Sequence, residues 1–147
     1  MDPTLHQHHI YHYLEIDAPQ KKVFSAISDP KELVKWWPLK CSGKPEMGAT
    51  YNFNFTDAYD WYGEVSKVIM NKNFHIKMTK SDEDWVHTTF GFNLDTKNGK
   101  TAVNFFHVNW EECNTHFKTA SFCWALLLDG LRNYLEKGIS IPFEERS

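Results

Sequence analysis

The chain has 147 residues, a length that fits one domain with a substantial hydrophobic core. Hydrophobic residues make up 41% and charged residues 24%, as in ordinary globular proteins, and the formal net charge is −3. No run of basic residues appears, which argues against nucleic-acid binding through the phosphate backbone. The aromatic share, 16%, is high, and large rings both fill cores and line cavities for apolar ligands.

Cysteine usage and the N-terminal residues indicate a cytoplasmic location. Cys41, Cys113 and Cys123 are odd in number, widely spaced and outside any C-x-x-C pattern, so reduced thiols are the simplest interpretation. The first residues lack the basic start and apolar stretch of a signal peptide. The longest apolar run, FCWALLL, is too short to span a bilayer. We therefore expect a soluble cytoplasmic protein without a membrane span.

The first elements in chain order are one strand and two short helices. Residues 9–17 alternate apolar and polar side chains, which is typical of a strand. A short helix is expected to follow Pro19, because apolar residues recur at helical spacing as far as Ile27. A second helix is expected to begin at Asp29, a good N-cap that is followed by proline at the first helical position. Pro38 disfavours helix at the residue before it and limits this second helix to about two turns.

The second helix ends in two adjacent tryptophans, Trp36 and Trp37. A helix of two turns cannot bury both indoles on one narrow stripe. Trp37 falls at helical spacing with Leu33 and Val34, whereas Trp36 lies about 100° further around the helix. We expect Trp37 in the core and Trp36 at the rim of a cavity, so that Trp36→Ala changes ligand affinity more than stability.

In the middle of the chain the hydrophobic period changes from helical spacing to two. Tyr51, Phe53 and Phe55 alternate with asparagines, a pattern that predicts a half-buried strand. Sequential strands joined by short turns predict an antiparallel meander. The remaining strands are expected over residues 61–69, 73–79, 85–94 and 100–110.

The last element is the strongest helical signal in the sequence. Residues 116–137 carry one broad apolar stripe, and Gly138 is a natural stop after it. An antiparallel sheet with one apolar face, covered by this long helix, buries both apolar surfaces. We therefore predict a single α+β domain over residues 1–147 with about six strands. Residues 1–8 are expected to be frayed, and residues 139–147 to form a C-terminal tail.

Four stretches in this order resemble one known family. APQKKVFSAISDPKELVKWW resembles the N-terminal signature of the activator of heat-shock-protein ATPase homologue (Aha-type) family. GATYNFNF, TAVNFFHVNW and SFCWALLLDGLRNYLEKG resemble its second strand, last strand and final helix, so the resemblance runs from about Tyr11 to Gly138. The family belongs to the SRPBCC superfamily. The resemblance therefore implies the helix-grip (START-like) fold, a curved antiparallel sheet wrapped around the C-terminal helix with a cavity between them.

The resemblance implies a cavity but no particular ligand. Superfamily members variously bind lipids and hormones, run cyclisations or bind chaperones, and a shared fold does not transfer a function. Many relatives have Gly-Trp where this chain has Cys123-Trp124. The cysteine side chain is expected to narrow the mouth of the cavity.

His107 is the best single candidate for a polar contact. Strand parity places it with Val103 and Phe105 on the inward face, and the family pattern also has a histidine at this point. Such an imidazole acts either as a general base or as a polar anchor for a ligand. The alternative is a core histidine bonded to a carbonyl or hydroxyl group, which is the more frequent case.

Metal and covalent chemistry find little support in the sequence. His6, His8, His9 and His12 crowd the N-terminus without a Cys, Asp or Glu to complete a ligand set, so no metal is expected. The chain has no G-x-S-x-G, no Gly-rich phosphate loop and no H-E-x-x-H. Cys123 in a helix interior is expected to act as a small hydrophobe. No cofactor is expected.

The favoured function is binding of an apolar or amphipathic small molecule in the cavity, without a catalytic residue set. One alternative is a cyclase- or dehydratase-like enzyme that uses His107 as acid or base. Another is a module that binds a heat-shock ATPase as a chaperone partner. Both a monomer and a homodimer are compatible with the sequence. The residues expected to contact the ligand are Trp36, Trp37, Tyr51, Phe53, Phe55, Phe90, Phe92, Phe105, His107, Trp124 and Leu128.

Overall fold

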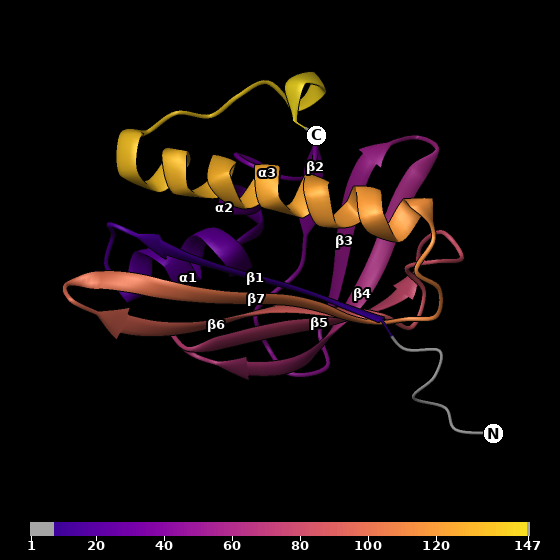
Figure 1. Ribbon diagram of the computed structural model, residues 1–147, viewed down its shortest axis with the longest axis horizontal. Coiled ribbons are helices and arrows are strands. Elements are labelled where there is room, and N and C mark those ends of the chain that lie inside the picture. Colours follow the sequence, from indigo (N-terminus) through magenta and orange to yellow (C-terminus); the bar gives the residue numbers. More distant parts are fainter. Residues whose placement is uncertain (1–7, 147) are drawn as a thin grey trace.

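Seven antiparallel strands form a curved sheet, and one long helix lies across its concave face (Figure 1). This computed structural model describes residues 8–146. The strands are β1 (His8–Ile16), β2 (Lys40–Ser42), β3 (Thr50–Thr56), β4 (Tyr59–Ile69), β5 (Asn73–Lys80), β6 (Thr89–Lys97) and β7 (Lys100–Trp110). The helices are α1 (Gln20–Ser28), α2 (Pro30–Leu33) and α3 (Thr115–Lys137), and a 3₁₀ turn, η2 (Phe143–Glu145), follows them.

The topology confirms the predicted helix-grip architecture. The strand order is β1-β7-β6-β5-β4-β3-β2, so the first two strands of the chain form the two edges of the sheet. Between them, β3 to β7 follow one another as a meander, in which each strand pairs with its neighbour in the sequence. The two short helices connect the edges, and α3 closes the concave face. This arrangement buries the apolar faces of the sheet and of the helix against each other.

The helix α3 begins and ends where its capping residues require. The side chain of Asn114 accepts a hydrogen bond from the backbone N–H of Phe117 at 2.9 Å, which satisfies one of the free donors of the first turn. At the other end Gly138 adopts φ of 69°, a left-handed conformation that glycine reaches without strain. The buried residues of α3 form the predicted stripe: Ala120, Trp124, Leu127, Leu128 and Leu131.

The polar face of the hairpin of β3 and β4 has one carboxylate that accepts hydrogen bonds from two asparagines. Asn52 and Asn54 alternate with the buried Tyr51 and Phe53, and both amide groups donate to the carboxylate of Asp60, at 2.7 Å and 3.1 Å. These hydrogen bonds, with that from Asn52 contributing most, hold the pKa of the Asp60 carboxyl below its usual range. The polar side of the hairpin is therefore ordered, which positions the aromatic residues on its other side.

At the end near α1 and α2 the aromatic rings between the sheet and the helices pack against one another, and we call this end the sealed half. A separate hollow of about 480 Å³ lies between α1, α2 and the end of α3. The Tyr51 ring contacts Phe74 with a centroid separation of 5.4 Å, and its hydroxyl donates to the carbonyl of Ser28 at 2.5 Å. Burial raises the pKa of the Tyr51 hydroxyl above its usual range. Gly43 lies over the same ring, where φ of 146° and a Cβ only 2.6 Å from Tyr51 would exclude other residues.

The two tryptophans after α2 correct one prediction. Trp36 does not line the pocket that holds Trp37, although it borders a separate hollow beneath the C-terminal tail. It is 2% exposed, and its Nε1–H donates to the carbonyl of Ala26 at 2.9 Å. Its ring meets Phe92 edge to face in the sealed half. Trp37, 5% exposed, faces Phe53 and Trp124 instead. The reason is the turn that follows α2. Because the helix ends at Leu33, the residues after it turn toward α1, and both indoles are covered from different sides.

Two element boundaries also differ from the sequence-based expectation. A seventh strand, β2, consists of three residues that pair with Asn52 to Asn54, and it is too short to show a periodic pattern. The strand expected over residues 85–94 begins later, at Thr89. Residues 83–87 form turns, and the backbone N–H of Trp85 bonds to the side chain of Asp82 at 3.0 Å. This local bond from an aspartate competes with strand pairing.

Candidate functional site

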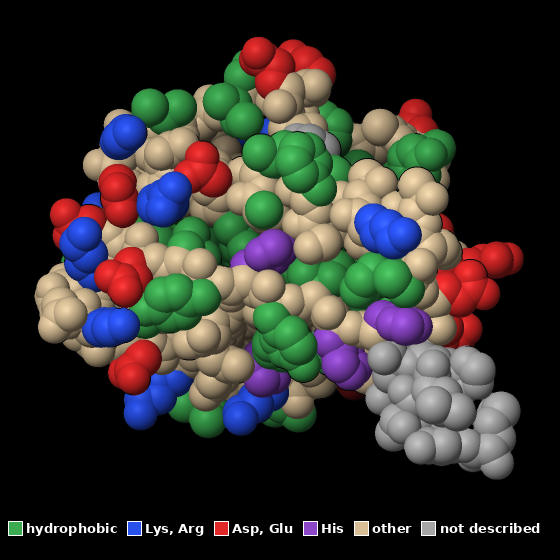
Figure 2. All heavy atoms as spheres, viewed as in Figure 1, with side chains coloured by type: hydrophobic (Ala, Val, Ile, Leu, Met, Phe, Trp, Pro, Cys, Tyr) green, Lys and Arg blue, Asp and Glu red, His purple; other side chains and the backbone are tan. Residues whose placement is uncertain are grey.

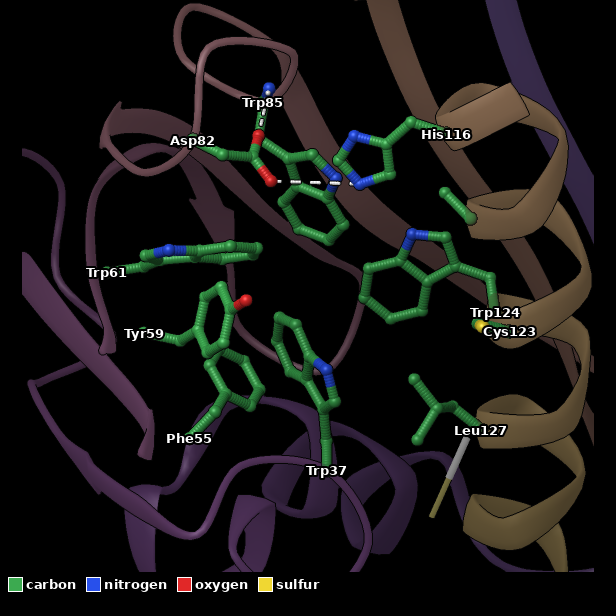
Figure 3. Close-up of a pocket in the computed structure, with 11 residues that line it drawn as sticks. Trp37, Phe55, Tyr59, Trp61, Asp82, Trp85, His116, Cys123, Trp124 and Leu127 are labelled. Atoms are coloured by element: carbon green, nitrogen blue, oxygen red, sulfur yellow. Dashed lines mark hydrogen bonds and ion pairs between the residues drawn. The ribbon is translucent and has the colours of Figure 1, made fainter. Parts of the chain in front are cut away.

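A pocket of about 450 Å³ lies between α3, the hairpin of β3 and β4, and the segment that joins β5 to β6 (Figure 3). Its volume falls within the range of small-molecule binding sites. One wall is a single face of the first turns of α3, whose lining residues recur at helical spacing: His116, Ala120, Cys123, Trp124 and Leu127. We call this cavity the aromatic pocket and the end of the molecule that contains it the open half.

Six of the eleven residues that line the aromatic pocket have large aromatic rings. Five of these rings close a circle in which each ring neighbours the next. The centroid separations are 5.7 Å for Trp37–Phe55, 5.3 Å for Phe55–Trp61, 4.9 Å for Trp61–Trp85, 6.0 Å for Trp85–Trp124 and 4.9 Å for Trp124–Trp37. Figure 3 shows these side chains around an opening. We call this set the ring circle.

The exposure of the rings gives the pocket a floor and a mouth. Trp85 and Trp124 are 7% and 1% exposed and belong to the hydrophobic core. Phe55 and Trp61 are half-buried. Tyr59, the sixth aromatic residue, is 54% exposed at the tip of the hairpin. Trp85 and Trp124 therefore form the apolar floor of the pocket, and its mouth, near Tyr59, opens to solvent.

Asp82 and His116 form the polar end of the pocket. His116 also contacts Asp84, which does not line the pocket, and we call these three residues the acidic cluster. His116 Nδ1 lies 2.7 Å from Asp84 Oδ2, and His116 Nε2 lies 3.7 Å from Asp82 Oδ2. All three side chains are about one-third exposed. Among the described residues that line the pocket, none is Lys or Arg. The acidic cluster thus has two carboxyl groups for one imidazole.

Local hydrogen bonds hold the acidic cluster against the start of α3. Asp82 Oδ1 accepts from the backbone of Trp85, which fixes the turn, and Asn114 Nδ2 lies 3.5 Å from Asp84 Oδ1. Asn114 is the N-cap of α3, and His116 is in its first turn. The partial positive charge of a helix N-terminus stabilises carboxylates nearby, so the placement of Asp84 is favourable.

His107 lies beneath the pocket rather than in its wall. It is 0% exposed, and both ring nitrogens are engaged. Trp124 Nε1–H donates to His107 Nδ1 at 3.1 Å, so the ring proton is on Nε2, which donates to Thr88 Oγ1 at 2.8 Å. The Thr88 hydroxyl in turn donates to the carbonyl of Trp85 at 2.6 Å. Every polar atom of this buried chain therefore has its partner.

The environment of His107 keeps it neutral. Burial, and to a smaller extent the nearby His116, lowers the pKa of His107 to about 3. The neutral ring fixes the orientation of the Trp124 indole through the hydrogen bond to its N–H. His107 therefore positions one member of the ring circle.

The residues expected to contact a ligand separate into two groups. Trp37, Phe55 and Trp124 line the aromatic pocket. The others pack in the core behind it or line smaller hollows. Trp36 borders a second cavity of about 320 Å³ beneath the C-terminal tail, and Leu128 borders a small one beside β1. The members of the core group are Tyr51, Phe53, Phe90, Phe92, Phe105 and His107.

Several pocket residues were not predicted. Trp61 and Trp85 were placed in strands without a site role, and Tyr59, Asp82 and His116 were not considered for the site. A weak sequence signal exists for part of this group, because aspartate side chains often bond nearby backbone groups in turns, and Ser81 to Asp84 contains two aspartates. Nothing in the sequence pairs that turn with the start of α3, which is 30 residues further along the chain.

Two kinds of feature, a group of metal-ligating side chains and a membrane-spanning helix, are absent from residues 8–146. Residues 8–146 contain no group of three or more His, Cys, Asp or Glu side chains that could hold a metal ion. His6, one of the four N-terminal histidines, lies outside the described residues. In the same part of the chain, no helix has the length and apolar character needed to cross a membrane.

Comparisons with known proteins agree with the fold. Residues 17–136 match the family model described as Activator of Hsp90 ATPase homolog 1-like protein. A comparison with curated proteins gave no match.

Solved structures share this architecture over nearly the whole chain. The Aha1 dimer from Colwellia psychrerythraea is 30% identical, with a TM-score of 0.81 over 89% of this chain and 98% of that one. A Mesorhizobium loti protein is 18% identical, with a TM-score of 0.78 over 90% of this chain and 99% of that one. A Staphylococcus saprophyticus protein is 19% identical, with a TM-score of 0.77 over 92% of this chain and 96% of that one. The chain belongs to the family of Activator of Hsp90 ATPase homolog 1-like proteins.

Proposed function

We propose that this protein binds an apolar or amphipathic small molecule in the aromatic pocket. The observation that carries the proposal is an open hollow of about 450 Å³ in which six of the eleven lining residues have large aromatic rings. The accessible part of this lining is also aromatic, because Phe55 and Trp61 are half-buried and Tyr59 is 54% exposed. The fold supports this proposal, because the family is one of ligand-binding domains.

The distribution of polarity around the pocket favours an amphipathic ligand. Trp37, Trp124 and Leu127 provide a buried apolar floor. Asp82 and His116 lie together at one end of the wall. A ligand with an apolar body and one polar group would match both parts, because each of its ends would then meet the environment it prefers.

The enzymatic alternative has less support. An acid or base must reach the proton that it transfers, and His107 is 0% exposed with both nitrogens bonded to Trp124 and Thr88. His116 is accessible, and its partners are two carboxylates rather than a nucleophile. Binding is therefore the function that the geometry favours.

The identity of any macromolecular partner remains a prediction. The family description refers to an Hsp90 ATPase activator, and the Colwellia relative is described as a dimer. In this chain, Phe122 and Leu126 on α3 are 66% and 48% exposed, which supports a homodimer through the outer face of the helix. Figure 2 shows hydrophobic side chains in separate groups on this side of the molecule, so such a contact would be small. The molar mass in solution distinguishes a monomer from this homodimer.

Two cysteines offer a matched test of the pocket. Cys123 lines the pocket on α3, whereas Cys113 is exposed in the segment before α3 and outside the pocket. We expect the neutral fluorescent probe N-phenyl-1-naphthylamine to bind wild type and Cys113→Phe with equal affinity. Cys123→Phe should bind it at least about tenfold more weakly, because the new ring occupies the cavity.

The two variants also distinguish pocket binding from loss of fold. Circular dichroism and thermal unfolding report whether Cys123→Phe is folded. A wild-type protein that does not bind the probe would refute the proposal. A folded Cys123→Phe variant that binds as tightly as Cys113→Phe would place the binding outside the aromatic pocket.

A further inference from the structure

We propose that residues 139–146, which follow α3, form a strap that controls the passage of a ligand through the mouth of the aromatic pocket. Held down by Arg146, the strap narrows the mouth, and released, it widens the mouth. The inference rests on the proposed function and adds how access to the same site is regulated. It depends on three observations: where the strap lies, what fastens it and how loosely it is packed.

The first observation is that the strap borders the aromatic pocket. After α3 the chain turns back and runs above the helix toward its middle (Figure 1). There Phe143, Glu144 and Arg146 line a hollow of about 300 Å³. Four other residues that line this hollow also line the aromatic pocket: Trp37, Phe55, Tyr59 and Leu127. Because one of them is Tyr59, at the mouth of the pocket, the strap lies beside that mouth.

The second observation is that side chains fasten the strap to the rest of the molecule. The guanidinium of Arg146 donates to four backbone carbonyls in the segment after α2, at 2.8 to 3.3 Å: those of Val34, Lys35, Trp37 and Pro38. The Ser140 hydroxyl donates to the carbonyl of Lys35 at 2.6 Å. The backbone hydrogen bonds of η2 are local to the strap. Hydrogen bonds from a charged donor are stronger than neutral ones, so Arg146 is the main fastening, and its release breaks no strand or helix.

The third observation is the loose packing of the strap. Every strap residue is exposed or half-buried, and Ile139 and Ile141 are 50% and 42% exposed. The cavity of about 320 Å³ that Trp36 borders lies between the strap and α3. Segments with few buried apolar contacts open at the lowest cost in free energy. The strap can therefore lift while the sheet and α3 stay folded.

The rates of ligand exchange test this inference. Stopped-flow fluorescence with N-phenyl-1-naphthylamine gives the association and dissociation rate constants. Arg146→Gln should raise both about fivefold or more, because the released strap is more populated with and without ligand. The two changes cancel, so the affinity should stay within about twofold of wild type. Ser140→Ala should act in the same direction with a smaller effect.

Arg132→Gln is the matched control for charge. Arg132 pairs with Asp129 on α3 and lines neither the aromatic pocket nor the hollow beside the strap. Its substitution removes the same charge, and we expect both rate constants to equal those of wild type. Circular dichroism and thermal unfolding show whether each variant is folded.

The outcomes separate the two proposals. If both rate constants of folded Arg146→Gln equal those of Arg132→Gln, the strap inference is overturned and the proposed function stands. A faster dissociation with a matching loss of affinity also overturns it, because Arg146 would then belong to a fixed wall of the site. If Arg146→Gln does not fold, Ser140→Ala decides by the same criteria. If the folded wild type does not bind the probe, both proposals are wrong.

Discussion

The sealed half and the open half contain the same kinds of side chain, but these fill space in the sealed half and line a pocket in the open half. In the sealed half, Trp36 and Tyr51 donate their polar hydrogens to backbone carbonyls of Ala26 and Ser28, and their rings fill the space around them. In the open half, the ring circle lies along a hollow of about 450 Å³ that is open to solvent. The difference is not the residue type but the backbone nearby. Where α1 and α2 cover the sheet, rings pack to full density, and where a hairpin and a turn face α3, they form a wall.

Adjacent residues show the contrast most directly. Trp36 and Trp37 have nearly the same exposure, 2% and 5%, yet one lies in the sealed half and the other in the ring circle. Exposure therefore does not distinguish a core ring from a pocket ring. The partners of each ring do, and substitutions in the two halves should separate stability from binding.

The largest effect is expected from Trp36→Ala. Removing a buried indole and its bond to Ala26 should lower the free energy of unfolding by about 3–5 kcal/mol, because the close-packed surroundings cannot fill the cavity. Affinity for N-phenyl-1-naphthylamine should change little. Trp61→Ala, in the half-buried wall, should show the reverse pattern, with an affinity about tenfold lower and a small loss of stability. Urea unfolding and probe titration of both variants give the four values.

If the two variants lost stability and probe affinity to the same extent, the distinction between the sealed half and the open half would be refuted. If Trp36→Ala lost affinity and kept its stability, the original assignment of Trp36 to a cavity rim would be restored. The second cavity beneath the C-terminal tail would then be the place to look for the ligand.

A smaller effect is expected from Thr88→Val, which tests the boundary between the halves. The substitution keeps the shape and leaves the Nε2–H of His107 without an acceptor, which should cost about 1–3 kcal/mol of stability. Because His107 orients Trp124, probe affinity should also fall. Thr79→Val on the exposed side of β5 is the control and should change stability by less than about 0.5 kcal/mol. Identical unfolding curves for the two variants would show that the buried chain contributes nothing.

The smallest effect, counted per pH unit, is the loss of stability that follows from the low pKa of His107. Its folded pKa of about 3 lies below the ordinary value near 6.5, so between these values the unfolded chain binds more protons than the folded one. The stability linked to His107 is complete above about pH 6.5 and is lost as the pH falls, by at most about 1.4 kcal/mol per pH unit.

The variant His107→Gln isolates this contribution. Chemical unfolding between about pH 4.5 and pH 7 should give a shallower slope for the variant than for wild type. Other groups, such as His75, whose pKa is also lowered by burial, contribute equally to both proteins. Parallel curves would mean that the pKa of His107 is the same in the folded and unfolded states, which would reopen its role as an acid or base.

Much of the architecture was predictable, because it depends on local patterns. The period-two run around Tyr51 and the stripe of α3 are direct consequences of strand and helix geometry. The stop at Gly138 was read from residue type alone. The start of β6 was not predicted correctly, because the hydrogen bond between Asp82 and Trp85 turns a strand-like sequence into a loop.

The site was predictable only in part. Phe55 and Trp124 were named because their parity or stripe faces inward, and both line the pocket. Phe90 and Phe105 share that inward orientation and yet pack beneath it, since parity gives the face of a sheet but not the position along the gap. Asp82 and His116 meet through folding alone, and no spacing in the sequence links them.

By itself, the sequence determined that this chain folds as a curved antiparallel sheet covered by one long helix, with many rings between them. Periodicity is a local property, and each strand or helix carries its own. The tertiary structure decided which rings fill the space and which enclose it. That choice depends on the curvature of the sheet and on the loops that meet α3, and these bring together residues such as Trp61, Trp85 and Trp124 from three separate elements.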